Sequence, residues 1–403
     1  MDDPRLEPAG QVINQLNLRR RTHLHLNLFA LATSLSTKMS DPVLDLTLPY
    51  ITPYEPGIGG AIRARSELFS VVEVPAYDPL GYGDHIYLNI TKRGRTTRDT
   101  QIDIASLLGI RREDVGHAGL KDKHAVSTQT FSILIPGEDE SEVAKLVESS
   151  LGVTVNWAKR HPKKLRSGHL KGNTFTITVT DLEDTPAIAL KKAKKIQKAV
   201  AKLGIPNYFG TQRIGKEGGN VLDGLGLITG KYRERNRWLR RFLISSYLSY
   251  LCNRYLARRV ESGNFTRIIR GDLAKKHDTG GVFTVEDEVI EQPRFDAGEI
   301  SFTAPIYGYK MRPAAYAAKE MEDAIFAESK VTLDDLRRAG ADGTRRLGRL
   351  LPDISISPHN EGVTLSFTLP AGGYATIILR EFMKNDVATF EPEAEEPEEN
   401  DEN

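Results

Sequence analysis

The chain has 403 residues, of which 39% are hydrophobic and 27% charged, and it contains 34 glycines. This composition is typical of a globular protein of two or three domains and excludes fibrous and wholly disordered classes. Its single cysteine, Cys252, excludes an internal disulfide and a thiolate zinc site, and favours a reducing cytosol. The nine histidines form no metal-binding motif and no phosphate-loop motif is present. We therefore predict neither a metal nor a cofactor.

Both ends of the sequence differ from the rest. Residues 1–40 are predicted to be a non-native or disordered extension, because Met39 opens a segment typical of a protein start. A targeting segment is the alternative, although His25 and Asn27 interrupt its short apolar run. Residues 391–403 hold seven Glu and one Asp with no apolar periodicity, which predicts a disordered acidic tail.

The overall charge of +1 hides a basic middle. Residues 1–38 carry three acidic and five basic side chains and the tail eight acidic ones, so residues 39–390 have a net charge of +7. Basic residues concentrate in 159–171, 191–202 and 231–241. The 191–202 run suits a solvated helix face as well as it suits a surface that contacts phosphates. The 159–171 run mixes Pro, Gly and His, so it is predicted to be a loop that contacts nucleic-acid phosphates through Lys163, Lys164 and Arg166.

In chain order, alternating and helical patterns predict an α+β protein with mixed sheets rather than a regular βαβ nucleotide-binding fold. A structured loop is expected over 205–216, and short strands and helices mix over 264–355. The expected strands are 60–74, 84–92, 129–136, 152–158, 173–181 and 362–370, and the expected helices 98–110, 139–150, 191–202, 236–261 and 374–384.

The segment AGLKDKHAVSTQTF, residues 118–131, places Asp122 between Lys121 and Lys123 at the entry to a strand. Aspartate is a common turn residue, and a solvated turn is the simpler interpretation. A carboxylate that nearby cations keep ionised can instead act as a nucleophile. The segment by itself leaves both interpretations open.

Three further segments accompany this one: RHPKKLRSGHLKGNTFTITV, GIPNYFGTQRIG and LPAGGYATIILREF. Together, in this order, the four resemble the signatures of the TruD family of tRNA pseudouridine synthases, in its archaeal-type form, over roughly residues 57–385. The resemblance implies an α+β catalytic domain with a mixed sheet, interrupted by an α+β insertion domain. We map the catalytic domain to 41–229 and 356–390, and the insertion to 230–355.

The resemblance implies an isomerase that converts a uridine of tRNA to pseudouridine, by family precedent the one at position 13 in the D arm. It further implies a cytoplasmic enzyme, here expected to be a monomer, with tRNA as its partner and no membrane. The alternatives are the same reaction at another RNA site, or a tRNA-binding or tRNA-folding protein without chemistry. A metal nuclease is disfavoured because no cluster of acidic ligands surrounds the motif.

The resemblance also assigns site residues. Asp122 matches the family's catalytic aspartate, which would act as the nucleophile. Two supporting polar positions, Arg63 and Glu73, and the flanking Lys121 complete this part of the site. If residues 121–123 are extended, their side chains alternate, so the cation that faces Asp122 stays open.

The positions that match base-contacting residues of the family are Phe69, Asn207, Phe209 and Tyr374. Phe69 also suits a core position in a strand, and Phe209 also suits a buried anchor in its loop. The chain departs from the family pattern at SELF, residues 66–69, where Pro-Glu-Asp-Phe is usual, and at Tyr374 and Cys252, where a Phe and another aromatic are common. None of these departures touches the nucleophile.

Overall fold

The computed structural model describes residues 43–385. The predictions for residues 1–40 and for the acidic tail 391–403 lie outside this range, as do both outer ends of the predicted catalytic domain. Within residues 43–385, no helix combines the length and the hydropathy that a membrane span requires.

The largest element is a mixed sheet in the order β14-β15-β7-β2-β5-β3-β6, with β1 pairing β7 and β4 pairing β5. β2 and β5 are parallel and the other pairs are antiparallel, so the predicted α+β class with a mixed sheet is confirmed. The strands are β1 Gly59–Ala61, β2 Phe69–Pro75, β3 His85–Lys92, β4 Val115–His117, β5 Val126–Leu134, β6 Thr154–His161, β7 Leu170–Leu182, β14 Ile354–His359 and β15 Gly362–Pro370.

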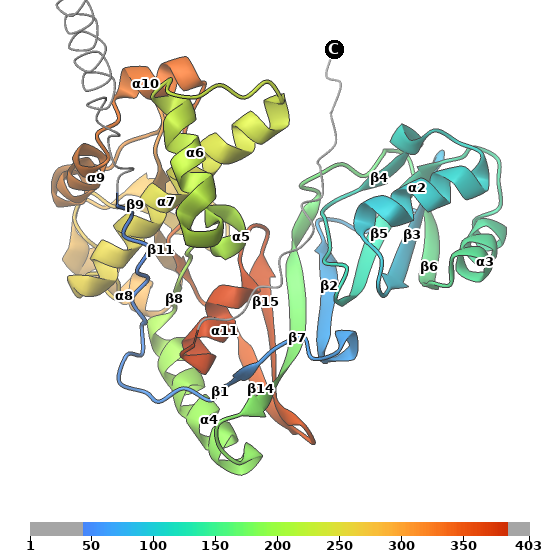
Figure 1. Ribbon diagram of the computed structural model, residues 1–403, viewed down its shortest axis with the longest axis horizontal. Coiled ribbons are helices and arrows are strands. Elements are labelled where there is room, and N and C mark those ends of the chain that lie inside the picture. Colours follow the sequence, from blue (N-terminus) through green and yellow to red (C-terminus); the bar gives the residue numbers. More distant parts are fainter. Residues whose placement is uncertain (1–42, 386–403) are drawn as a thin grey trace, which may run out of the picture. The chain divides into compact units, whose positions relative to one another are not determined.

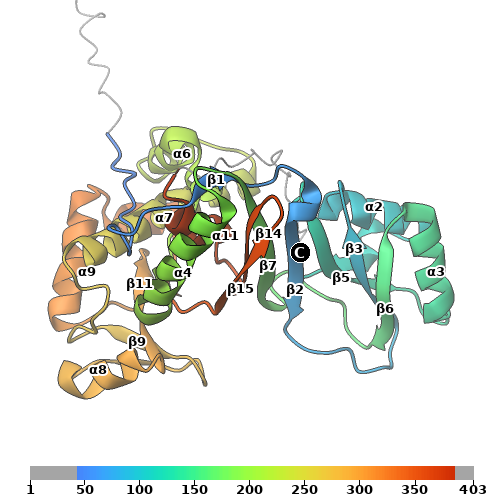
Figure 2. The same cartoon turned by 90° about the horizontal axis from the view of Figure 1, so that it is seen from below.

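Strand β15 joins two distant parts of the sequence. It pairs antiparallel with β7 from Val363 opposite Val179 to Pro370 opposite Gly172, and the two strands lie side by side in both views (Figures 1 and 2). The alternating pattern of 362–370 therefore does mark a core strand, and its partner comes from the first half of the chain, as the sequence predicts.

Helices cover the sheet at two places. At the first, α2, Thr97–Leu108, and α3, Glu140–Leu151, lie beside the strands β3, β5 and β6 (Figure 1). The apolar core that these helices share with the strands includes Ile86, Leu88, Ile104, Phe131 and Val147. Burial of these side chains contributes most of the stability there, because it removes apolar surface from water.

At the second place, α4, Pro186–Leu203, packs against β14 and β15, and α11, Ala375–Met383, contacts α4 and β1. The buried side of α4 is formed by Ala189, Ala193, Ile196 and Val200, which recur at helical spacing. The lysines of the 191–202 run lie mainly on the other, exposed side of the helix. Exposure of these lysines fits both interpretations that the sequence allows, a solvated helix face and a surface that contacts phosphates.

A second sheet, in the order β10-β9-β11-β12, comes entirely from residues 273–347. Its strands are β9 Leu273–Lys276, β10 Val282–Thr284, β11 Ile300–Ile306 and β12 Thr344–Leu347. Three helices precede this sheet in the sequence, α5 Thr211–Ile214, α6 Gly219–Ile228 and α7 Arg237–Glu261, and three lie between its strands, α8 Glu288–Asp296, α9 Tyr316–Glu328 and α10 Leu333–Ala339. A short pair, β8 Ile205–Pro206 with β13 Arg349–Leu350, connects the two parts.

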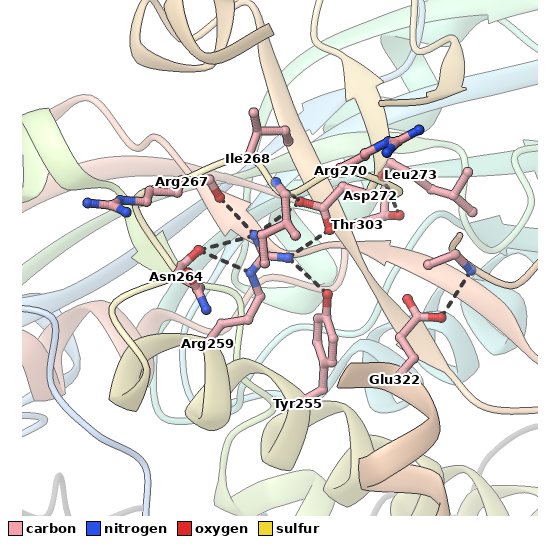
Figure 3. A network of polar contacts seen from close by, with 12 residues as sticks. Tyr255, Arg259, Asn264, Arg267, Ile268, Arg270, Asp272, Leu273, Thr303 and Glu322 are labelled. Carbon is pink, nitrogen blue, oxygen red and sulfur yellow. Dashed lines mark hydrogen bonds and ion pairs between the residues drawn. The ribbon is translucent and has the colours of Figure 1, made fainter. Parts of the chain in front are cut away.

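A buried ion pair ties α7 to the second sheet (Figure 3). Arg259 donates to Asp272 Oδ1 at 2.7 Å and Oδ2 at 3.1 Å, and both side chains are at most 1% exposed. The guanidinium also donates to the Tyr255 hydroxyl and to the backbone oxygens of Asn264 and Arg267. Because both charged groups have partners, burial of this pair is tolerated.

Candidate active site

Asp122 lies in the turn that precedes β5, where it forms an ion pair with Arg63. Asp122 Oδ2 is 2.5 Å from Arg63 Nη2, and the two side chains are 16% and 6% exposed. The other oxygen, Oδ1, accepts a hydrogen bond from the His124 backbone N–H at 2.9 Å. The carboxylate is therefore held by a cation and a backbone donor, yet part of it stays accessible.

The lysine that precedes Asp122 has a different partner. Lys121 Nζ lies 2.7 Å from Glu73 Oε2, and these side chains are 3% and 2% exposed. Glu73 Oε1 also accepts from the Thr130 N–H, and the Lys121 N–H donates to Thr97 Oγ1. This buried pair fixes the start of the turn. Because residues 121–123 lie outside any strand, the alternation argument does not apply to them, and Arg63 supplies the cation that pairs with Asp122.

Arg63 has an unusual backbone. Its φ of 65° lies in the left-handed region, which side chains other than glycine seldom adopt. β1 ends at Ala61, before Arg63, a single 3-10 turn follows over Ser66–Leu68, and β2 starts at Phe69. The unbroken strand predicted over 60–74 is therefore wrong, because an extended strand cannot include a residue with positive φ.

The ring of Phe69 supports this arginine. The Arg63 Cζ lies 4.8 Å from the ring centroid, and Phe69 is 4% exposed. The Arg63 Nε is buried and has no hydrogen-bond partner among residues 43–385. Phe69 thus packs in the core and holds the cation of the Asp122 pair, and Nε retains a donor that is not used.

A second cluster contains Phe209 and Tyr374. Their ring centroids are 5.9 Å apart at an interplanar angle of 63°, an edge-to-face arrangement. Gly210 permits this approach, because a Cβ there would lie 3.1 Å from the Tyr374 ring. Asn253 of α7 holds the backbone of Phe209, accepting from its N–H at 2.8 Å and donating to its carbonyl oxygen at 2.9 Å.

Arg346 of β12 completes this cluster, and sequence reasoning missed it. Its Nε donates to the Asn207 carbonyl oxygen at 3.0 Å, and its Nη2 donates to Asn207 Oδ1 and, at 2.9 Å, to the Gly372 carbonyl oxygen. Its Cζ lies 3.9 Å from the Phe209 ring centroid. Asn207 Nδ2 donates to the Leu347 carbonyl oxygen. One basic residue in the run TRRLGR carries no sequence signal that distinguishes it from its neighbours.

The structure thus groups the predicted residues into two clusters. Asp122, Arg63 and Phe69 lie at the start of β2, and Glu73, the partner of Lys121, lies further along the same strand. Asn207, Phe209 and Tyr374 gather where β15 ends. β2 and β15 flank β7, so that Phe69 and Leu365 both lie opposite Ile177.

The three basic residues predicted to contact RNA lie in the loop between β6 and β7. Leu165 anchors this loop: it is 4% exposed and its N–H donates to Ser132 Oγ at 2.9 Å. Lys163 and Arg166 on either side are exposed. Lys164 is half-buried, and its ammonium donates to the Glu113 carbonyl oxygen. The loop therefore presents two of its three cations fully to solvent.

Comparison with known proteins gives consistent matches. The family model for tRNA pseudouridine synthase D (TruD) matches residues 46–237 and 232–382. The tRNA pseudouridine synthase D of Anaeromyxobacter dehalogenans strain 2CP-C is 42% identical over 347 residues, which cover 84% of this chain and 97% of that protein. A protein of the same name from Thermus thermophilus is 41% identical over 337 residues, covering 83% and 92%.

A solved structure has the same fold. It comes from Methanosarcina mazei, is described as a candidate tRNA pseudouridine synthase D, and superposes with a TM-score of 0.68 at 24% sequence identity. The match covers 86% of this chain and 99% of that one. The shared fold therefore extends over both sheets.

Proposed function

Because this chain belongs to the TruD family of tRNA pseudouridine synthases, we propose that Asp122 is the nucleophile with which it converts a uridine of tRNA to pseudouridine. The observation that carries the assignment is the ion pair of Asp122 with Arg63 at 2.5 Å. A solvated turn residue has no need of a cation that is itself 6% exposed and held in a left-handed backbone conformation.

The reaction is an isomerisation that uses ordinary side chains. The bond between ribose C1′ and base N1 breaks, the base turns over, and a bond forms between C1′ and C5. C5 loses a proton and N1 gains one, so that atoms and charge balance. A carboxylate that attacks the ribose or the base holds the fragment while the base rotates, and Arg63 holds that carboxylate in position.

Further parts of this proposal concern the substrate and the setting of the enzyme. We place the target at uridine 13 in the D arm, with Asn207, Phe209 and Tyr374 holding the base after it leaves its stack. Lys163, Lys164 and Arg166 would contact the RNA backbone. The enzyme would be a cytoplasmic monomer, with a catalytic domain of residues 41–229 and 356–390 and an insertion of residues 230–355. The second sheet, at 273–347, supports this division.

The test is a map of pseudouridine in total tRNA from cells with the gene, without it, and with the Asp122→Asn variant. We expect one site in the D arm to lose its modification in the second and third samples. Loss of pseudouridine at a different site would assign that site, in place of uridine 13, as the target. An unchanged map would leave a tRNA-binding protein without chemistry as the better description.

A further inference from the structure

Arg346 is a cation without a carboxylate. Its three hydrogen bonds all go to neutral oxygens, those of Asn207 and Gly372. Among residues 43–385, no Asp or Glu forms an ion pair with it. The neighbouring Arg345, by contrast, pairs with Glu322 at 2.5 Å. A partly buried charge is costly unless an opposite charge offsets it.

A second arginine acts on Arg346. Burial, the main cause, lowers the pKa of Arg346, Cys252 and Tyr374 raise it, and the charge of Arg213 on α5 lowers it. Arg213 itself lies over the Phe242 ring, with Cζ 5.1 Å from the centroid. Two arginines thus influence each other near the Phe209–Tyr374 pair, and in the described part of the chain no acid pairs with either of them.

The guanidinium of Arg346 keeps one edge for a ligand. Phe209 covers one face, and Nε and Nη2 are engaged, which leaves the Nη1 edge without a hydrogen bond to the described residues. Arg346 is half-buried. Arg349, by contrast, is 2% exposed and donates to the carbonyl oxygens of Phe295 and Ile300, so its role is structural. A planar edge of N–H donors suits a phosphate oxygen.

Building on the proposed function, we propose that Arg346 binds a backbone phosphate of the tRNA next to the uridine held by Phe209 and Tyr374. The same side chain would fix Asn207, since Arg346 has only donors and the Asn207 amide oxygen must face it. One arginine would then both bind the RNA backbone and hold Asn207 in position for the base.

The experiment compares Arg346→Met, Arg346→Lys and, as a matched control, Arg258→Met, in which a half-buried arginine paired with Glu328 is lost. Binding of a tRNA transcript is measured as a function of salt, together with kcat, KM and Tm. For Arg346→Met we expect about ten- to hundredfold weaker binding and a salt slope smaller by about one. Arg346→Lys should keep the slope, and Arg258→Met should keep both slope and affinity.

An unchanged slope in a folded Arg346→Met protein would overturn the phosphate contact, even if kcat falls, because that result describes a residue that only positions Asn207. If Arg346→Met does not fold, an Arg346→Lys protein with the slope of the unaltered protein but reduced kcat supports the proposal, and a reduced slope contradicts it. Failure of the proposed function would differ from all of these, since the unaltered protein would then make no pseudouridine.

Discussion

Replacing Asp122 by Asn separates a nucleophile from a turn residue. The substitution keeps the size of the side chain and leaves an oxygen that can accept from the His124 N–H, but removes the charge. Both residues suit turns, so a structural role would survive. A nucleophile would not, and we expect no detectable pseudouridine.

The effect on stability follows from the ion pair. Arg63 is 6% exposed and would face a neutral amide oxygen at 2.5 Å instead of a carboxylate. A hydrogen bond to a charged group contributes about 1.5–3 kcal/mol and a neutral one about 1 kcal/mol, so we expect a loss of about 1–2 kcal/mol. For a chain of this size the Tm should fall by a few degrees, about 2–4 °C per kcal/mol at most. The variant should therefore remain folded.

The assay is tritium release from C5-labelled uridine in tRNA, with filter binding of the same tRNA. The matched control is Asp139→Asn, because Asp139 Oδ1 accepts from the N–H two residues ahead at 2.9 Å, as Asp122 does. The control should keep full activity, and tRNA affinity of Asp122→Asn should hold or rise slightly. Activity of Asp122→Asn within tenfold of the parent would refute the assignment.

Three further outcomes are expected. The double variant Lys163→Ala, Arg166→Ala should lower the salt slope of tRNA binding by about two without changing kcat, whereas replacement of two exposed lysines of α4 should leave the slope unchanged. Equal slopes in the two double variants would contradict a specific phosphate contact by the loop. Lys121→Met should lower the free energy of unfolding, measured with urea, by about 3–5 kcal/mol because it leaves the buried Glu73 carboxylate without its cation. The double variant Glu73→Leu, Lys121→Met should lose less stability than the sum of the two single variants, and additive losses would contradict the pairing. Burial, and then the charge of Lys163, lowers the pKa of His161, so the stability that its neutral form contributes is complete above about pH 6.5 and declines as the pH falls. In unfolding measured from pH 7 to 5, His161→Gln should weaken this decline, and an unchanged pH dependence of stability would refute the role of His161.

The sequence by itself determined the class of the fold and most of its elements. The period of apolar residues marked β15 because this strand buries one face along its length, and this pattern is local. The long apolar pattern of α7 marked a helix that is buried on most sides between Leu243 and Arg259. The segment around Asp122 was recognisable because the residues that carry its chemistry are close together in the chain. The strand predicted across Arg63 failed because no local pattern reports a positive φ at a residue other than glycine.

The tertiary structure alone decided which charges meet. Asp122 pairs with Arg63 and Lys121 with Glu73, although the sequence places Lys121 beside Asp122. Arg346 reaches Asn207 and Gly372 only because β12, the 205–210 segment and the turn after β15 come together in space. Side-chain partners of this kind depend on distances between segments far apart in the chain, and neither periodicity nor composition records those distances.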